Sequence, residues 1–315
     1  MTTTMSLKVI YVTRHGFRSN WVVDANTGEY SSNIPSPTNI ASDPALAGKG
    51  VEQSHELAAH LQTLSPPIQR FYTSPFYRCI QTISPTIEAL ARTNADSETL
   101  KIRGEHGVGE WYGMARFDHP SPAEPGLLIK LFPRYDVEYR PKIKPSVNGE
   151  TIDELHDRTA YALHKIIEES DKEGVEAILI CTHAATLIAL GRVLTGRMPQ
   201  DIGEEDFRPF TCGLTTFVRQ DGKTPLGQVP EWNGPETTIP SVTWRKGKGV
   251  GGGWELTKSG DCSFLTEGEE RGWRFSGDES FVATTTGPGL DAGSGLGVVV
   301  EGKKSSLSPT NTPRL

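Results

Sequence analysis

The sequence has few cysteines, no long apolar run and only a small excess of one charge. Its four cysteines lie far apart in 315 residues without a Cys-x-x-Cys pair, which indicates reduced thiols and not a disulfide framework (Cys79, Cys181, Cys212 and Cys262). No run approaches the roughly 20 apolar residues of a transmembrane helix, and residues 1–8 lack the apolar segment of a secretory signal. The net charge of −7 gives no reason to expect nucleic acid or a membrane as a direct ligand. We expect a cytoplasmic or nuclear protein.

Two motifs are superficially like metal or cofactor sites but lack the required spacing. His55 and His60 are five residues apart on an expected helix, whereas a zinc pair needs positions i and i+4 on one face. The glycine-rich segment 247–253 lacks the helix and the acidic residue of a dinucleotide site, so we interpret it as a flexible linker. We therefore expect no metal and no cofactor.

A short apolar run near the N-terminus is followed at once by basic residues. Residues 9–13 are β-branched and aromatic, which predicts a buried strand. Arg14, His15 and Arg18 come next, and open α/β sheets bind ligands at the carboxyl ends of strands. Guanidinium groups suit phosphate oxygens, so we predict an anion site with His15 as its nucleophile. The reactive nitrogen must be unprotonated, and the other ring nitrogen should therefore donate to a backbone carbonyl.

Two later segments supply further candidates. Arg78 falls about one turn into a helix predicted to begin near Ser74, where a bound anion would resolve its conflict with the helix dipole. Glu110 precedes Trp111 and Tyr112, and desolvation by these rings predicts a raised pKa that suits a general acid. The alternatives are a surface arginine and a polar loop residue.

The strongest buried strand ends at a second histidine. Residues 175–182 form a nearly continuous apolar run, as expected for a strand covered on both faces. His183 follows, and residues 184–194 have helical spacing. Because this repeats the arrangement at His15, we expect the side chains of the separate segments to converge on one cationic pocket. The alternative is a histidine with a purely structural role.

The remaining segments predict the domain organisation. Residues 1–220 are expected to form the core, in which residues 21–39 are a surface loop and residues 113–147 an inserted lid or a solvated loop. A lid would place basic side chains against the leaving group of a substrate (Arg116, Lys130 and Arg134). Residues 221–275 are expected to dock on the core as a C-terminal extension, and residues 276–315, rich in Gly, Ser, Thr and Pro, to be disordered.

These motifs together resemble the histidine phosphatase superfamily, which includes phosphoglycerate-mutase-like enzymes. The resemblance covers residues 8 to about 220. It rests on Arg-His-Gly-x-Arg at 14–18, Asp-x-x-Leu-x-x-x-Gly-x-x-Gln at 43–53, Ser-Pro-x-x-Arg-Cys-x-Gln-Thr at 74–82, Gly-x-Gly-Glu-Trp-Tyr at 107–112 and Thr-His-Ala-Ala at 182–185. It implies an α/β fold, a three-layer α/β/α sandwich with a mostly parallel central sheet. It also implies a phosphohistidine at His15, proton transfer by Glu110, and phosphate binding by Arg14, Arg18, Arg78 and His183, without a metal.

Departures from the family narrow the reaction class. Mutase members usually carry Glu-Ser after Arg-His-Gly, whereas Phe17 and Arg18 stand here. We therefore prefer a phosphatase to a phosphoglycerate-mutase-type phosphotransferase. Ala184 follows His183, where the acid phosphatase and phytase branch has aspartate, so that branch is disfavoured.

The C-terminal segment sharpens the resemblance. Trp254-x-Leu-Thr, Ser263-Phe-Leu and Trp273-x-Phe are similar to fungal proteins related to the histidine-phosphatase subunit of the RNA polymerase III factor TFIIIC. That subunit continues into a partner-binding domain, whereas a low-complexity segment follows here, so we expect a stand-alone phosphatase. Its substrate would be a phosphorylated small molecule or a phosphoprotein. The alternative is an assembly subunit, catalytic or not, whose partners are TFIIIC subunits.

Overall fold

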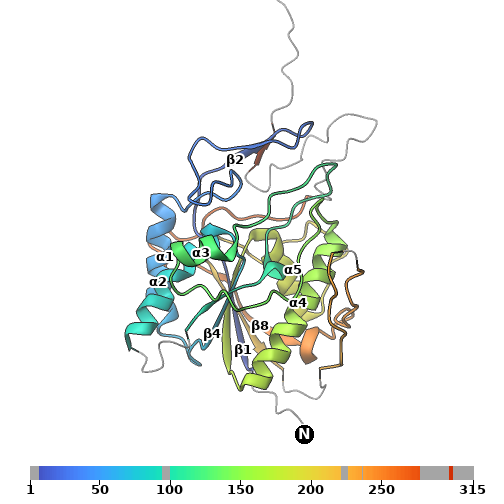
Figure 1. The fold of residues 1–315 in the computed structure, drawn as a ribbon. Helices are drawn as coiled ribbons and strands as arrows, with labels where there is room; N and C mark the ends of the chain where they lie inside the picture. Colours follow the sequence, from blue (N-terminus) through green and yellow to red (C-terminus); the bar gives the residue numbers. More distant parts are fainter. Residues whose placement is uncertain (1–6, 94–99, 221–225, 236, 277–297, 301–315) are drawn as a thin grey trace, which may run out of the picture.

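The computed structural model describes residues 7–93, 100–220, 226–235, 237–276 and 298–300. Its centre is a six-stranded sheet with the strand order β5-β4-β6-β1-β7-β8 (Figure 1). The strands are β1 (Val9–Arg14), β4 (Arg70–Thr73), β5 (Ile102–Gly104), β6 (Ala177–Thr182), β7 (Leu214–Arg219) and β8 (Trp254–Asp261). β5, β4, β6 and β1 run parallel, whereas β7 is antiparallel to both β1 and β8. The expected mostly parallel sheet is confirmed.

β1 and β6 lie in the middle of the sheet and are buried along their whole length. Their apolar sequences suit strands that are covered on both faces. The two strands pair in register until Arg14 lies opposite Thr182. Because they end side by side, the residues that follow them, His15 and His183, begin next to each other at one edge of the sheet.

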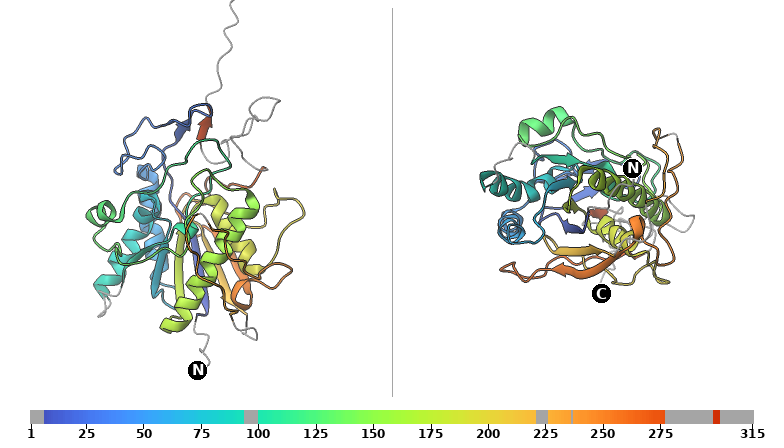
Figure 2. Two further views of the ribbon diagram at one scale, coloured as in Figure 1. Left: turned by 45° about the vertical axis from the view of Figure 1, so that its right-hand side comes forward. Right: turned by 90° about the horizontal axis from the view of Figure 1, so that it is seen from below.

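Helices cover both faces of the sheet (Figures 1 and 2). The two pairs are α1 (Gly48–Leu61) with α2 (Tyr77–Thr93), and α4 (Ile152–Glu173) with α5 (Ala184–Thr195). Alternate β1 side chains enter the two cores: Tyr11 packs in the core with α1 and α2, and Val12 in the core with α4 and α5. The expected three-layer α/β/α sandwich is therefore confirmed. Among the described helices, not one combines the length and apolarity needed to cross a bilayer.

The chain after residue 220 contributes to the same sheet and core. β8 extends the sheet beyond β7, and Trp244, Trp254 and Phe275 are buried in the core that contains α4 and α5. This packing supports a C-terminal extension docked on residues 1–220. The flexible linker expected over residues 247–253 is wrong, because this segment contains the short 3-10 helix η3 (Val250–Gly252). The buried side chain of Val250 packs in the core and holds the glycines in place.

A small second sheet corrects the expected surface loop over residues 21–39. This segment contains β2 (Trp21–Val23) and β3 (Tyr30–Ser31), which pair with each other. β2 also pairs with β9 (Val298–Val300). Trp21 and Val23 are buried, and burial of these two apolar side chains holds the segment against the core although most of its residues are polar. Of the tail expected to be disordered, residues 277–297 and 301–315 lie outside the described residues.

The expected insertion lies between β5 and α4. The 3-10 helix η2 (His106–Val108) precedes it, and α3 (Pro125–Leu131) lies within it. The buried carboxylate of Glu105 accepts hydrogen bonds from the Tyr139 hydroxyl (2.7 Å) and the Lys142 amide (2.9 Å). This carboxylate ties the insertion to the segment that continues into Glu110.

Candidate active site

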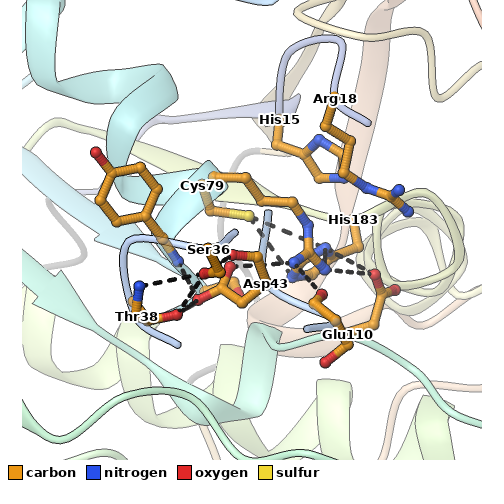
Figure 3. Close-up of polar contacts among 12 residues, drawn as sticks. His15, Arg18, Ser36, Thr38, Asp43, Cys79, Glu110 and His183 are labelled. Carbon is orange, nitrogen blue, oxygen red and sulfur yellow. Dashed lines mark hydrogen bonds and ion pairs between the residues drawn. The ribbon is translucent and has the colours of Figure 1, made fainter. Parts of the chain in front are cut away.

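The six residues predicted for the site converge at the carboxyl ends of β1 and β6. Figure 3 shows His15, Arg18, Glu110 and His183 among them. They come from the ends of β1 and β6, from the first turn of α2 and from the segment after η2. The imidazole rings of His15 and His183 have centroids 5.3 Å apart. All six side chains are at most 8% exposed (Arg14, His15, Arg18, Arg78, Glu110 and His183). The structure therefore brings together every predicted member of the site.

His15 is held in one tautomer. Its Nδ1 lies 2.8 Å from the carbonyl oxygen of Gly16. Because a carbonyl oxygen can only accept, Nδ1 carries the proton and Nε2 carries the lone pair. The predicted backbone carbonyl partner is thus confirmed. Burial, together with the charges of Arg78 and His183, lowers the pKa of His15 well below its ordinary value of 6.5, so the ring is neutral at neutral pH.

The turn after His15 packs directly against the start of α1. A Cβ atom on Gly16 would lie 2.8 Å from the carbonyl oxygen of Gly50, and one on Gly50 would lie 2.0 Å from the carbonyl oxygen of Phe17. Only glycine permits so close an approach of two backbones. These glycines therefore fix where the His15 ring lies relative to the helices.

Arg78 connects most of the charged groups. Its Nη1 donates to the carbonyl oxygen of Ser42 (3.0 Å) and to Oδ1 of Asp43 (3.2 Å). Its Nη2 donates to Oε2 of Glu110 (2.8 Å) and lies 3.2 Å from Nδ1 of His183. Burial lowers the pKa of Arg78, but the charges of Glu110 and Asp43 outweigh burial and raise it above its ordinary value. The guanidinium is a charged, oriented fork at the centre of the site.

The expected raised pKa of Glu110 is wrong. Burial raises this pKa, but the charges of His183, Arg78 and Arg18 lower it by more than burial raises it. The pKa of Glu110 is therefore well below its ordinary value of 4.5. Oε2 of Glu110 lies 2.8 Å from Arg78 Nη2 and 3.0 Å from His183 Nδ1. The carboxyl is therefore ionised in this structure, and its aromatic neighbours do not decide its protonation state.

His183 is hydrogen-bonded through both ring nitrogens. Nδ1 faces Glu110, and Nε2 lies 2.7 Å from the hydroxyl oxygen of Ser74. Burial lowers the pKa of His183, but the charges of Cys79 and Glu110 outweigh it and raise this pKa above 6.5. These charges favour the protonated ring, and a protonated His183 can donate to an anion. Ser74 was expected only near a helix start, and its contact with His183 is a role that sequence reasoning missed.

Arg14 and Arg18 are held by groups outside the predicted set. Nη1 of Arg14 donates to the carbonyl oxygens of Pro209 (2.9 Å) and Arg271 (2.5 Å). The guanidinium carbon of Arg18 lies 3.8 Å from the centroid of the Trp21 ring. Burial lowers the pKa of both arginines, that of Arg14 to about 10. Crowded buried cations are unfavourable, and a bound anion would offset that cost.

The buried charges leave the site positive. With His183 protonated, three guanidinium groups and one imidazolium outnumber the anionic groups among them, which are the carboxylates of Asp43 and Glu110 and the Cys79 thiol in its ionised form. The net positive charge suits a phosphate monoester, which is an anion at neutral pH. In the part of the chain that the structure describes, no group of three or more His, Cys, Asp or Glu side chains is placed to hold a metal ion.

Asp43 is a candidate that sequence reasoning missed. It is fully buried and accepts hydrogen bonds from the Tyr77 amide (2.9 Å) and the Thr38 hydroxyl (3.3 Å), as well as from Arg78 (Figure 3). It binds the Nη1 side of the guanidinium, whereas Glu110 binds the Nη2 side. In the sequence, Asp43 is recognisable only as the first residue of the family motif at 43–53, to which no role was assigned. We infer that it positions Arg78.

Asp43→Asn should keep the shape of this side chain and remove its charge. Arg78 would lose one of its two carboxylates, and we expect its fork to turn away from the phosphate position. The kcat/KM for p-nitrophenyl phosphate should fall about tenfold, or about 1.4 kcal/mol. The inhibition constant of vanadate should rise with it, which a purely structural role would not cause. Asp153→Asn, at a side chain that is 81% exposed, is the control, and equal kinetics in the two variants would refute the role of Asp43.

A pocket of about 420 Å³ adjoins the site on the side of the insertion. Its lining includes Glu110, Phe76, Tyr112, His119 and several prolines. It is large enough for an organic group attached to a phosphate.

The structure does not place the three basic residues of the insertion at this pocket. Arg116 and Lys130 are exposed, and Arg134 donates to the carbonyl oxygen of Leu100 (3.4 Å) beside β5. The basic residues that line the pocket are Arg140 and Lys144. Composition indicated basic residues in the insertion, but their direction depends on how it folds back over the site.

Comparisons with known proteins place the chain in a family. Residues 10–231 match the histidine phosphatase superfamily (branch 1). The chain is 34% identical over 281 residues to the transcription factor tau 55 kDa subunit of Saccharomyces cerevisiae, covering 86% of this chain and 59% of that protein. It is 28% identical over 237 residues to the ecdysteroid-phosphate phosphatase of Drosophila melanogaster, covering 68% of this chain and 31% of that protein. The chain thus spans less than two thirds of either relative.

A solved structure shows the same fold. The crystal structure of the Bombyx mori ecdysone phosphate phosphatase in complex with tungstate superposes with a TM-score of 0.53 at 21% identity. The superposition covers 73% of this chain and 97% of that chain. The expected fold is confirmed, and the yeast relative confirms the resemblance to the TFIIIC-related proteins.

Proposed function

Because the chain belongs to the histidine phosphatase superfamily (branch 1), we propose that it hydrolyses a phosphomonoester through a phosphohistidine intermediate, without a metal ion. His15 is the nucleophile, and Glu110 transfers the proton. Arg14, Arg18, Arg78 and His183 bind the phosphate. The observation that carries this proposal is the neutral His15 ring, with Nδ1 bonded to the Gly16 carbonyl, among buried cations.

In the first step, Nε2 of His15 attacks phosphorus in line, and the bond from phosphorus to the leaving oxygen breaks. The cationic groups hold the equatorial oxygens and stabilise the charge that spreads over them. Positioning and charge are the main requirements of phosphoryl transfer, so side chains alone can supply them.

Glu110 transfers a proton in both steps of the proposed reaction. When a phosphate ester binds, Arg78 and His183 turn their hydrogen bonds towards its oxygens, and the pKa of Glu110 rises as they leave it. The carboxyl then takes a proton from the monoanionic form of the ester and passes it to the leaving oxygen. In the second step the Glu110 carboxylate accepts a proton from water, the water oxygen bonds to phosphorus, and the nitrogen–phosphorus bond breaks.

The pocket beside Glu110 supports a substrate with a bulky leaving group. Glu110, the proposed proton donor to the leaving oxygen, is one of its lining residues, and prolines and aromatic rings line much of the rest. A phosphorylated small molecule or a phosphorylated side chain of a protein fits this description. The test is hydrolysis of p-nitrophenyl phosphate by the purified chain, which should persist after treatment with EDTA. Absence of turnover would contradict the proposed phosphatase.

The pH dependence of kcat/KM should be bell-shaped, with one limb on each side of pH 6.5. His15 must be unprotonated, and because its pKa is lowered, activity should be lost only as the pH falls below 6.5. His183 must be protonated, and because its pKa is raised, activity should be lost only as the pH rises above 6.5. Initial rates measured between pH 4 and pH 9 check this. An acid limb centred above pH 6.5 would contradict the neutral nucleophile.

A second candidate function is an assembly subunit of a transcription factor, acting in the nucleus. The 34% identity to the tau 55 kDa subunit favours it. Affinity purification from the native cells should then recover TFIIIC subunits with the chain. The two functions can coexist, because one uses the buried pocket and the other an outer surface.

A further inference from the structure

The segment Glu270–Arg271 lies against the phosphate site. It contacts Arg14, which is 257 residues earlier in the sequence than Arg271. The Thr211 amide donates to the carbonyl oxygen of Glu270 (3.2 Å), and Nη1 of Arg14 donates to the carbonyl oxygen of Arg271. The Glu270 carboxylate accepts from Nζ of Lys49 (2.6 Å) and Nε2 of Gln53 (3.4 Å). The segment is therefore fixed on both sides.

The backbone of Arg271 is held in an unfavourable conformation. Its φ is +48°, in the left-handed region that residues other than glycine and asparagine rarely adopt. Such strain persists only where the surroundings enforce it, and it is concentrated at functional sites. Here the carbonyl bond to Arg14 and the anchored Glu270 are the enforcing contacts.

The Arg271 side chain extends over the turn that follows His15. Its guanidinium carbon lies 3.9 Å from the centroid of the Phe17 ring, and Nη1 donates to the carbonyl oxygen of Arg18 (3.2 Å). Arg271 is exposed, whereas Arg14, Arg18 and Arg78 are buried. An anion approaching the site would therefore meet Arg271 before the buried arginines.

The charge of Arg271 reaches the buried site. It contributes to lowering the pKa of both Arg14 and Arg18, for which burial is the largest cause. Its own acidic neighbour, Glu270, is turned towards Lys49. Glu270 shares its negative charge between Lys49 and Arg271, and the guanidinium of Arg271 still acts on both buried arginines.

We propose that Arg271 is a substrate-binding residue at the rim of the phosphate site, supplied by the C-terminal extension. It attracts the incoming phosphate ester and binds the ester outside the reacting centre. This inference rests on the proposed function, and it concerns binding, not chemistry. Because the stacking on Phe17 holds the guanidinium beside the turn, its interaction should be equal in the ground state and the transition state, so it should affect KM and not kcat.

The test uses Arg271→Gly and Arg271→Asn in the full chain. Both residues adopt positive φ, so the carbonyl that holds Arg14 stays in place while the guanidinium is lost. Arg274→Gly is the matched control, because Arg274 is a 64% exposed arginine of the same segment, paired with Glu205. The measurements are kcat and KM for p-nitrophenyl phosphate, and the dissociation constant of inorganic phosphate by calorimetry.

Both Arg271 variants should raise KM and the phosphate dissociation constant about five- to tenfold, with kcat within about twofold of the wild type. The Arg274 variant should change neither. Unchanged phosphate affinity in the Arg271 variants, or a loss of kcat with an unchanged KM, would overturn the proposal. If the wild type binds phosphate but does not turn over the ester, the proposed phosphatase fails, and the calorimetric comparison still decides the role of Arg271.

Discussion

His15→Ala should reduce the turnover of p-nitrophenyl phosphate by at least about 10³-fold, the scale expected when an essential nucleophile is removed. The mutation removes the only group to which phosphorus is proposed to bond. It leaves the surrounding cations in place, so inorganic phosphate should still bind. Steady-state rates and calorimetric titration with phosphate check the two parts of this expectation.

The matched control is His55→Ala, which removes an exposed imidazole on α1. It should leave both turnover and phosphate binding unchanged. If His15→Ala and the wild type turned over the ester at equal rates, catalysis would not take place at this pocket. The geometry around His15 would then have to serve the assembly function alone.

Arg78→Met should damage both activity and stability. The apolar side chain removes the fork that binds phosphate, and loss of such a donor costs about 10²- to 10³-fold in kcat. It also leaves the buried carboxylates of Asp43 and Glu110 without their shared partner. Breaking a buried ion pair from one side typically lowers the free energy of unfolding by about 3–5 kcal/mol. Urea denaturation and initial rates measure the two effects.

Two further variants separate these effects. Arg78→Lys keeps the charge but not the fork, and should lose most activity with a smaller loss of stability. Arg208→Met breaks an ion pair with Glu269 in which both side chains are 49% exposed, and should cost at most about 1 kcal/mol without a change in rate. If Arg78→Met were as stable and as active as Arg208→Met, Arg78 would not be the centre of the site.

The sheet and the six site residues were predictable because their signals are local. β1 (Val9–Arg14) and β6 (Ala177–Thr182) lie within two residues of the predicted ranges 9–13 and 175–182, since each is a short, mostly apolar run rich in β-branched residues. The convergence of His15 and His183 followed from two apolar strands, each ending at a histidine. Parallel pairing of β1 with β6 places the ends of the two strands, and therefore the two histidines, side by side.

The contacts that orient these residues were not predictable in the same way. Glu110 owes its lowered pKa partly to Arg78, 32 residues away, and a balance between burial and distant charges cannot be read from the two rings beside it. Arg14 is held by carbonyl groups 195 and 257 residues away. Asp43 carried no local pattern that distinguishes a buried carboxylate from a turn residue. Such contacts exist only once the chain is folded.

The proposed reaction requires a covalent bond between Nε2 of His15 and phosphorus. The direct measurement is rapid quenching of the wild-type chain during turnover of a ³²P-labelled phosphomonoester, followed by peptide mapping under basic conditions. We expect an acid-labile label on the peptide that contains His15, and no label in His15→Ala. Turnover with no label, or with the label on another residue, would contradict it.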